Sequence, residues 1–181
     1  ISHGAPNGRK SLHNPEVTNS PVSERLQYSG NDFEINFFDD EILKVHDTNG
    51  IFCLQLDERR VASQSELKAI KKKEKRDPKY YRAKIVWNNI RHIAETLDKK
   101  GRFAWGITAI GSDFDGTINP IDEYWTAEFM ERLETHLQEH AFNYMRKHGD
   151  KLQSRNRVDP NEIVDRIMYR NAYDFLGRYF R

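Results

Sequence analysis

The chain has 181 residues, of which 37% are hydrophobic and 31% are charged, and its mean hydropathy is -0.86. These values are low for a domain that buries a complete core, so we expect the chain to be part of a larger fold. The 29 lysines and arginines balance the 28 aspartates and glutamates, and a net charge of +1 gives no reason to expect a nucleic acid partner.

The cysteine content and the hydropathy exclude cysteine-based cross-links and a membrane-spanning helix. Cys53 is the only cysteine, which excludes an internal disulfide and a zinc site built from several cysteines. No apolar run approaches the ~20 residues that a membrane-spanning helix requires, so no transmembrane segment is predicted. The basic run at 71–76 is expected to be a solvated helix face.

The chain opens like the end of a strand. The first residue is Ile rather than Met, and Ile1 to Gly4 is typical of the tail of a strand whose beginning lies before this sequence. A long loop rich in Gly, Pro, Asn and Ser is expected over 4–35. Asn36 is then the candidate N-cap of a short helix, with Asp39-Asp40 in its first turn and Gly50 past its end.

Two predicted strands flank a long helix. The apolar run 51–56 predicts a buried strand, and a second one is expected over 103–110. Between them, Asp77 and Pro78 are strong start signals for a helix whose apolar residues recur at helical spacing until Gly101. Because a strand, a crossover helix and another strand form a βαβ unit, we expect the two strands to be parallel.

The last third of the chain, 117–181, is expected to be helical. One stripe of apolar residues at helical spacing consists of Trp125, Phe129, Leu133, Leu137, Ala141 and Tyr144. A final helix is predicted to start at Asp159-Pro160. The chain 1–181 is therefore interpreted as one partial α/β domain, with a loop at 4–35, a βαβ part at 36–116 and a helical part at 117–181.

The second strand leads into a motif that holds two carboxylates. Asp113 and Asp115 follow it, flanked by Gly111 and Gly116. The carboxyl ends of parallel strands are where α/β enzymes usually carry their catalytic groups, and glycines let a substrate approach the backbone. Asp113 is the candidate catalytic residue. Asp115 and Gly116 are assigned mainly to turn geometry, with the carboxylate bonding local backbone and the glycine at positive φ.

One alternative is phosphate chemistry. Asp-x-Asp-Gly-Thr after an apolar strand is the opening motif of the haloacid dehalogenase phosphatases, and 113–117 match it. Asp113 would then be the nucleophile and Asp115 the acid and base. That fold needs further strands downstream, whereas the residues after Gly116 are expected to be helical.

A second alternative is a zinc site on the helix of the last third. His136 and His140 with the glutamate between them fit the H-x-x-E-H motif, and Glu162 is a candidate third ligand. Histidines at positions i and i+4 share a helix face. The same face borders the apolar stripe, so we favour the interpretation that these histidines pack against a core.

Four segments occur in the order seen in the renal, or membrane, dipeptidase family. They are 1–3, 39–57, 106–116 and 171–180, and the strongest match is Ile110 to Gly116 together with Asp39-Asp40. The chain resembles the C-terminal part of that family, whose members are (β/α)8 barrels with two zinc ions. The resemblance implies that strands six, seven and eight end at His3, Leu56 and Ile110, and that 171–176 belongs to the closing helix.

The resemblance also implies roles for two strand-end residues. His3 would be a zinc ligand. Asp113 would lie beside a metal-bound hydroxide, contact the substrate amine and pass a proton to the departing nitrogen. The implied activity of the intact protein is zinc-dependent hydrolysis of a dipeptide or small amide, and the implied location is the cell envelope or outside the cell. The isolated chain is expected to be inactive and to hold no stoichiometric zinc.

Two departures from the family pattern leave other outcomes open. The family's other zinc ligands belong to segments before Ile1, and its substrate-binding arginine falls at Ile35, so Arg9, Lys10 or Arg25 would have to replace it from the loop. A barrel-derived binding protein without catalysis is therefore an alternative. Because three strands leave open sheet edges, we also expect association with another copy or a rearranged packing.

Overall fold

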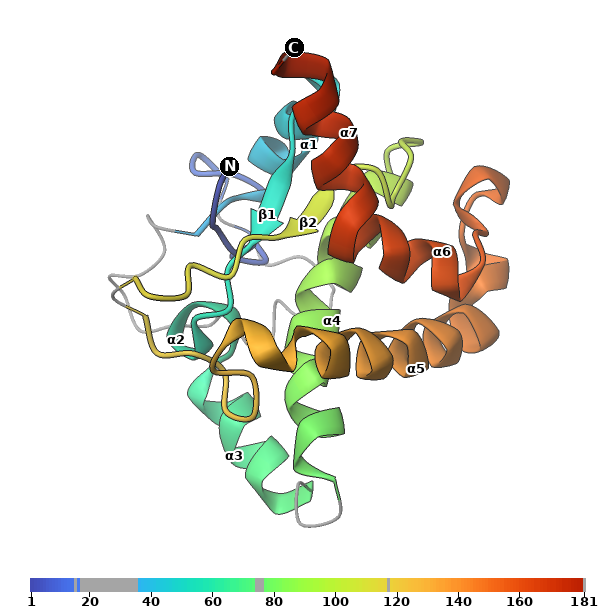
Figure 1. Cartoon of the computed structure of the whole chain (residues 1–181). Helices are drawn as coiled ribbons and strands as arrows, with labels where there is room; N and C mark the ends of the chain where they lie inside the picture. The colour runs from blue at the N-terminus through green and yellow to red at the C-terminus, as the bar shows by residue number, and fades with distance from the viewer. Residues whose placement is uncertain (15, 17–35, 74–76, 117, 181) are drawn as a thin grey trace.

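The structure of the protein is a computed structural model, and it is described for residues 1–14, 16, 36–73, 77–116 and 118–180 (Figure 1). It is mostly helical, with a small sheet in which β1 (Phe52–Leu54) and β2 (Thr108–Ile110) run parallel. The register pairs Cys53 with Ala109. The prediction of an α/β chain with parallel strands is confirmed at this level, although both strands are shorter than expected.

The first residues of the chain pair with the outer edge of β1. The amide of Cys53 donates to the carbonyl of Ile1 at 3.0 Å, and the amide of Gly4 donates to the carbonyl of Cys53 at 3.0 Å. Gly4 and Leu54 form a parallel bridge. Three segments therefore lie side by side in chain order, all running in one direction.

The helix α1 (Asp39–Asp47) has its two aspartates in the first turn and ends before Gly50, as predicted. The prediction of Asn36 as its N-cap is wrong, because Phe38 occupies that position. The carbonyls of Arg9 and Lys10 accept hydrogen bonds from the first helical amides at 2.9 and 3.1 Å. Asn36 instead binds Arg60, accepting from its Nε at 2.7 Å and donating to its carbonyl at 3.0 Å.

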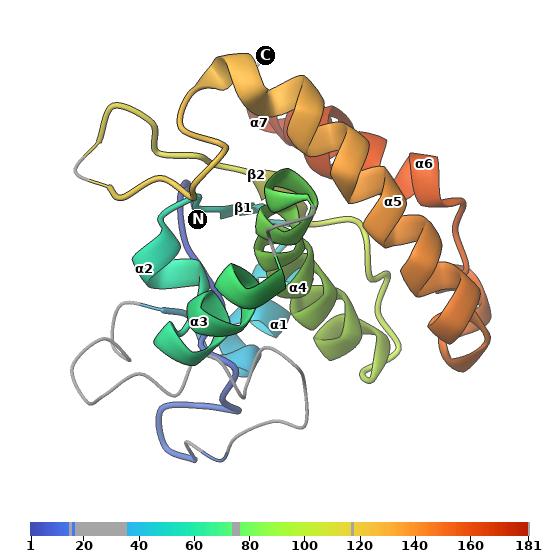
Figure 2. The same ribbon diagram turned by 90° about the horizontal axis from the view of Figure 1, so that it is seen from below.

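The helices α2 (Glu58–Val61), α3 (Gln64–Lys73) and α4 (Pro78–Asp98) follow β1. Asp77 caps α4 as predicted, since its carboxylate accepts from the amide of Tyr80 at 3.0 Å. Helix α4 lies at the centre of the molecule, with α5 on one side and α1 on the other (Figures 1 and 2). Its buried residues Ile93 and Leu97 pack with Phe52, so α4 joins the helical layers to the sheet.

The last third is helical, as expected. It contains η1 (Ala127–Phe129), α5 (Met130–His148), the short turns η2 (Gly149–Lys151) and η3 (Ser154–Asn156), α6 (Pro160–Asp165), the π-helical turn η4 (Arg166–Arg170) and α7 (Asn171–Tyr179). The stripe of Leu133, Leu137, Ala141 and Tyr144 is buried on α5. Trp125 precedes the helix and is 51% exposed, so its assignment to the stripe was wrong.

The second strand is short because a buried asparagine binds the residues before it. Asn156 accepts from the amide of Ala104 at 2.9 Å, and its carbonyl accepts from Trp105 Nε1 at 2.9 Å. Asn171, the first residue of α7, donates to the carbonyls of Trp105 and Thr108 at 2.8 Å. The side chains of Asn156 and Asn171 thus bind two backbone groups that lie before β2, the amide of Ala104 and the carbonyl of Trp105.

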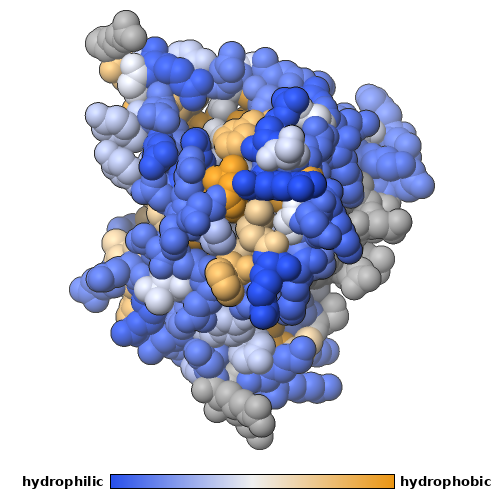
Figure 3. Space-filling view, turned by 90° about the vertical axis from the view of Figure 1, so that its right-hand side faces the viewer, coloured by the Kyte–Doolittle hydropathy of each residue, from blue (hydrophilic) through white to orange (hydrophobic). Residues whose placement is uncertain are grey.

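Most surface residues on the face at the right of Figure 1 are hydrophilic, and the hydrophobic ones form small separate patches (Figure 3). Helix α7 carries several exposed aromatic residues, among them Tyr173 and Tyr179. None of the helices in the described ranges combines the length and the apolar character that crossing a bilayer requires.

Candidate functional site

Polar side chains follow β1 and β2 at the edge where both strands end. Gln55 comes directly after β1 and is 4% exposed, and Asp113 follows β2 by three residues. Nε2 of Gln55 donates a hydrogen bond to Oδ2 of Asp113 at 2.7 Å. The parallel sheet therefore brings together two side chains that are 58 residues apart in the chain.

The backbone of the acidic motif is unusual. Asp113 has a φ of 61° and Asp115 a φ of 66°, both in the left-handed region that L-residues other than Asn and Asp rarely adopt. The carbonyl of Asp113 accepts from the amide of Gly116 at 3.0 Å, which closes the turn. Non-glycine residues held in this region often cluster at functional sites, because only the surrounding structure keeps them there.

Two parts of the predicted turn geometry need correction. Gly116 does not take a positive φ. The two residues of the motif that do are Asp113 and Asp115. Glycine is needed at 116 for space, because a Cβ there would lie 2.7 Å from Oδ1 of Asp113. Among the described residues, the exposed carboxylate of Asp115 accepts no hydrogen bond, so the predicted bond to local backbone is absent there.

Gly111 brings the start of the chain close to the second strand. A Cβ at this position would lie 2.1 Å from the carbonyl oxygen of Ser2 and 2.6 Å from Cβ of Cys53. Only a glycine permits this approach, since the nearest atom belongs to backbone. The segment that carries His3 is thereby held against β1 and the end of β2.

His3, the predicted zinc ligand, is exposed, and its Nδ1 lies 3.1 Å from the hydroxyl of its neighbour Ser2. Over the described ranges, no three side chains of His, Cys, Asp and Glu are gathered closely enough to hold a metal ion. The structure thus places His3 at a strand end without assembling a ligand set around it.

A buried arginine ties together the two loops that follow the strands. Arg82 on α4 is 2% exposed; its Nη1 donates to Glu58 at 2.5 Å and its Nη2 to Asp122 at 2.9 Å. Glu58 is the first residue of α2, which follows β1, while Asp122 lies in the loop between β2 and η1 that contains the acidic motif. Burial raises the pKa of Glu58, and the charge of Arg82 opposes that rise. Arg82 therefore fixes the loop of Asp113 relative to β1.

Sequence reasoning missed both Gln55 and Arg82. Arg82 did leave a signal, because it lies four residues before Val86 on the same apolar stripe of α4, where a charged residue calls for a buried partner. Gln55 had a weaker signal, as a polar residue within a predicted buried strand.

The basic residues of the first loop that were candidates for binding the substrate carboxylate do not contact Asp113 in the described structure. Arg9 and Lys10 lie at the start of α1, where their carbonyls bind its first amides. Lys10 forms an ion pair with Glu16. Arg25 and Ile35 are outside the described residues.

The H-x-x-E-H motif is used in packing. His140 Nε2 lies 2.9 Å from the carbonyl of Tyr80, and the two rings are 4.2 Å apart. Burial lowers the pKa of His140 to about 4, so this side chain is neutral at pH 7 and donates through Nε2. Glu162 pairs with Arg166 at 2.7 Å. His140 Nε2 and the carboxylate of Glu162 are thus engaged by other groups, whereas Nδ1 of His136 is buried without a hydrogen-bond partner in the described structure.

The chain was compared with protein-family models, with curated proteins and with solved structures, and none of them matches it. These comparisons show no family for the chain. The candidate site at the strand ends is therefore argued from its own geometry.

Proposed function

We propose that this chain supplies the strand-end carboxylate of a hydrolase that cleaves a dipeptide or another small amide, with Asp113 carrying the proton. The observation that supports this most is the position of Asp113. It lies at the carboxyl end of a parallel strand, on left-handed backbone, with one carboxylate oxygen bound by the buried Gln55.

The arrangement of the strands supports the finer part of the proposal, a likeness to the last strands of a (β/α)8 barrel of the renal dipeptidase type. Successive strands of such a barrel are parallel neighbours, each followed by helix. The segment 1–5, β1 and β2 are parallel neighbours in chain order, and helices follow each of them. Gln55 and Asp113 lie at the carboxyl edge, where such barrels carry their active sites.

Amide hydrolysis needs a group that moves one proton. The oxygen of a water molecule adds to the carbonyl carbon, the C–N bond breaks, and a proton from the water ends on the departing nitrogen. Gln55 occupies Oδ2 of Asp113. Oδ1 faces Gly116, where the absence of a side chain leaves room. Oδ1 is therefore the atom proposed to accept the proton and release it.

Zinc belongs to the proposal through the family resemblance, and His3 is the ligand that the chain would contribute. The described residues do not by themselves fit a zinc ion, because His3 stands without two further ligands among them. Other segments would have to complete the site. The role of Asp113 rests on its own position and hydrogen bond.

The proposal is tested by replacing each aspartate of the motif in the full-length protein that contains this chain. Asp113→Asn keeps the size of the side chain and should reduce the zinc-dependent turnover of a dipeptide by about 10²- to 10⁴-fold, the usual effect of losing a general acid or base. Asp115→Asn is the matched control and should stay within a few fold of the parent. Full activity of Asp113→Asn would overturn the proposal.

The same two variants distinguish amide hydrolysis from the phosphatase alternative. Magnesium-dependent hydrolysis of p-nitrophenyl phosphate that is lost in both Asp113→Asn and Asp115→Asn would favour a phosphatase. No turnover of either substrate by the parent would favour the binding protein.

A further inference from the structure

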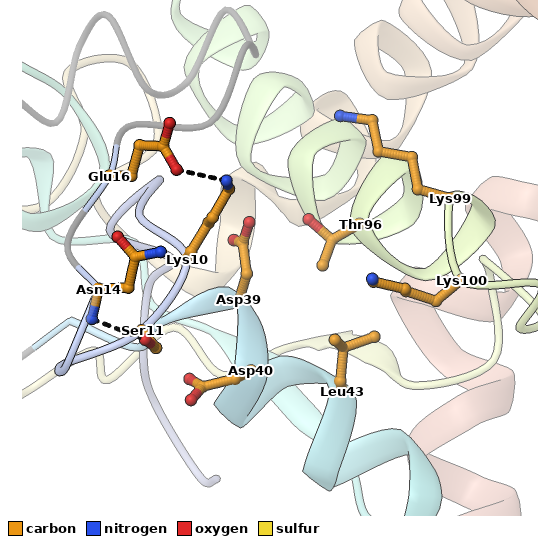
Figure 4. A pocket seen from close by; sticks show the side chains of 10 residues that line it. All are labelled: Lys10, Ser11, Asn14, Glu16, Asp39, Asp40, Leu43, Thr96, Lys99 and Lys100. Carbon is orange, nitrogen blue, oxygen red and sulfur yellow. Dashed lines mark hydrogen bonds and ion pairs between the residues drawn. The ribbon is translucent and has the colours of Figure 1, made fainter.

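Two pockets that border α4 differ in charge. The pocket at the start of α1 has a volume of about 730 Å³, and acidic and basic side chains both line it, among them Asp40 and Lys100 (Figure 4). The other pocket has a volume of about 240 Å³ and lies between α4 and α5, which pack against each other (Figures 1 and 2). Cations line it, and no carboxylate of the described residues does. This second pocket therefore favours an anion, whereas the first selects neither sign.

The basic side chains of this pocket come from one face of each helix. Lys84 and Arg91 lie about two turns apart on α4, with the buried Trp87 between them. Lys147 and His148 lie in the last turn of α5 and line the same pocket. The packing of α4 on α5 thus brings together basic residues that are distant in the sequence.

Arg91 is held in a fixed orientation. Its Nε donates to Oε1 of Glu95 at 2.6 Å, and the hydroxyl of Tyr144 donates to the same oxygen at 3.1 Å. The guanidinium carbon lies 5.2 Å from the centre of the Tyr144 ring, and the side chain of Arg91 is 23% exposed. Nη1 and Nη2 donate to no group of the described residues. The end of a fixed guanidinium, with its planar pair of donors, is therefore available to a ligand.

Positive charge in the pocket acts on His148. The pKa of His148 is lowered, first by burial and then by the charges of Arg91 and Lys151. Lys147 acts in the same direction, and Glu95 opposes it. Lys147 is exposed and forms no ion pair with another described residue. An anion in the pocket would therefore relieve a repulsion between basic side chains.

We propose that the pocket between α4 and α5 binds a phosphate group, either as the free ion or on a small phosphorylated molecule. Nη1 and Nη2 of Arg91 would donate to two phosphate oxygens, and Nζ of Lys147 to a third. A phosphate group carries close to two negative charges at pH 7, whereas a carboxylate carries one. Three cations without a carboxylate in the lining match the larger charge. The volume lies below the usual range for a drug-sized ligand, which suits a group of this size.

The test titrates the protein with inorganic phosphate at constant ionic strength and follows binding by calorimetry and by NMR of the histidine rings. Phosphate should bind saturably and raise the pKa of His148, because the anion offsets the positive charge around that ring. Acetate carries one charge and should bind at least about 10-fold more weakly. Glycerol phosphate is the second probe. Affinity similar to that of phosphate would show that a phosphorylated molecule fits, and binding of phosphate alone would assign the pocket to the free ion.

Variants of the two proposed donors locate the binding. Arg91→Gln and Lys147→Ala should each weaken phosphate about 10-fold, since each removes a charge-assisted contact. Arg91→Lys keeps the charge but loses the planar pair of donors, so it should weaken phosphate as well. Because Lys147 is exposed, Lys147→Ala tests the pocket even if Arg91→Gln lowers stability. Arg178→Gln, at an exposed position on α7, is the matched control and should change nothing.

Asp113→Asn distinguishes this pocket from the strand-end site, because Gln55 and Asp113 are not among its lining residues. Unchanged phosphate affinity in Asp113→Asn, with loss in Arg91→Gln and Lys147→Ala, supports the inference. Phosphate binding that is lost in Asp113→Asn alone would overturn it and would favour the phosphatase alternative instead. Equal affinity for phosphate and acetate, or no saturable binding of phosphate, would also overturn it while leaving the proposed function standing.

Discussion

Gln55 holds Asp113 from the neighbouring strand, donating from Nε2 to Oδ2 at 2.7 Å. Gln55 is 4% exposed, and its own Oε1 is buried without a hydrogen-bond partner in the described structure. An unpaired buried acceptor is unfavourable by about 1–3 kcal/mol. Retaining such a group is reasonable if its amide orients a carboxylate for chemistry.

Replacing Gln55 by leucine removes that donor at nearly constant volume. We expect kcat for dipeptide hydrolysis to fall about 10- to 100-fold, as is typical for a lost supporting hydrogen bond at a site, with KM nearly unchanged. Stability should fall little, because the unpaired Oε1 is removed as well. Steady-state kinetics measure both parameters, and a change confined to KM would argue against a positioning role. Cys53→Ala, in β1 two residues before Gln55, is the control and should leave both parameters near those of the parent.

Replacing Gly111 by alanine should destabilise the fold. Its Cβ would lie 2.1 Å from the carbonyl oxygen of Ser2, so the first segment must move away from the sheet. We expect a loss of about 2–3 kcal/mol in the free energy of unfolding, typical of overpacking. Gly177→Ala is the matched control: no atom lies within 4 Å of its new Cβ in α7, and alanine should stabilise that helix by about 0.5–1 kcal/mol. Urea denaturation measures both, and equal effects would contradict the packing at Gly111.

Replacing Arg82 by methionine leaves the partly buried carboxylate of Glu58 without its cation. The free energy of unfolding should fall by about 1–3 kcal/mol, less than when one partner of a fully buried ion pair is lost, because water reaches part of Glu58. The double variant Arg82→Met with Glu58→Gln should recover much of this loss, because no unpaired charge stays buried. Arg178→Met, at an exposed position on α7, is the control and should leave the melting temperature unchanged. Additive losses in the double variant would show that the pair does not hold the loops.

Stability should fall as the pH decreases from 6.5 to 4. Burial lowers the pKa of His140 from 6.5 to about 4, so between these values the unfolded chain binds a proton that the folded chain does not. Since a tenfold change in proton affinity corresponds to about 1.4 kcal/mol, this residue accounts for a loss of about 3 kcal/mol across that range. His140→Gln keeps a donor for the carbonyl of Tyr80 and should flatten this part of the profile. Identical pH profiles for the two proteins would contradict this effect.

The parts of the fold that the sequence predicted depend on local signals. Asp77 and Pro78 begin α4 because a cap and a fixed φ act within one turn. The failures come from distant contacts. Asn36 does not cap α1, because the carbonyls of Arg9 and Lys10 reach its first amides. The strand predicted from 103 is cut short by Asn156, which lies 52 residues from Ala104.

In the candidate site, too, the part set by local sequence could be predicted and the part set by distant contacts could not. Asp113 could be placed from the sequence alone, because an apolar run followed by a glycine and two carboxylates indicates a strand end. The side chains that hold Asp113 and its loop could not be predicted in this way. Gln55 is 58 residues from Asp113 in the sequence, and Arg82 is 24 residues from Glu58. The sequence also did not predict the left-handed backbone at Asp113, which the folded loop imposes on it.

The central claim is that Asp113 carries the proton in amide hydrolysis. The most direct measurement is the turnover of a dipeptide by the zinc-supplied full-length protein, with Asp113→Asn and Asp115→Asn compared in parallel and zinc content measured by elemental analysis. We predict that Asp113→Asn loses about 10²- to 10⁴-fold in kcat at unchanged zinc content, while Asp115→Asn stays near the parent. Turnover by Asp113→Asn at the rate of the parent protein would contradict the account.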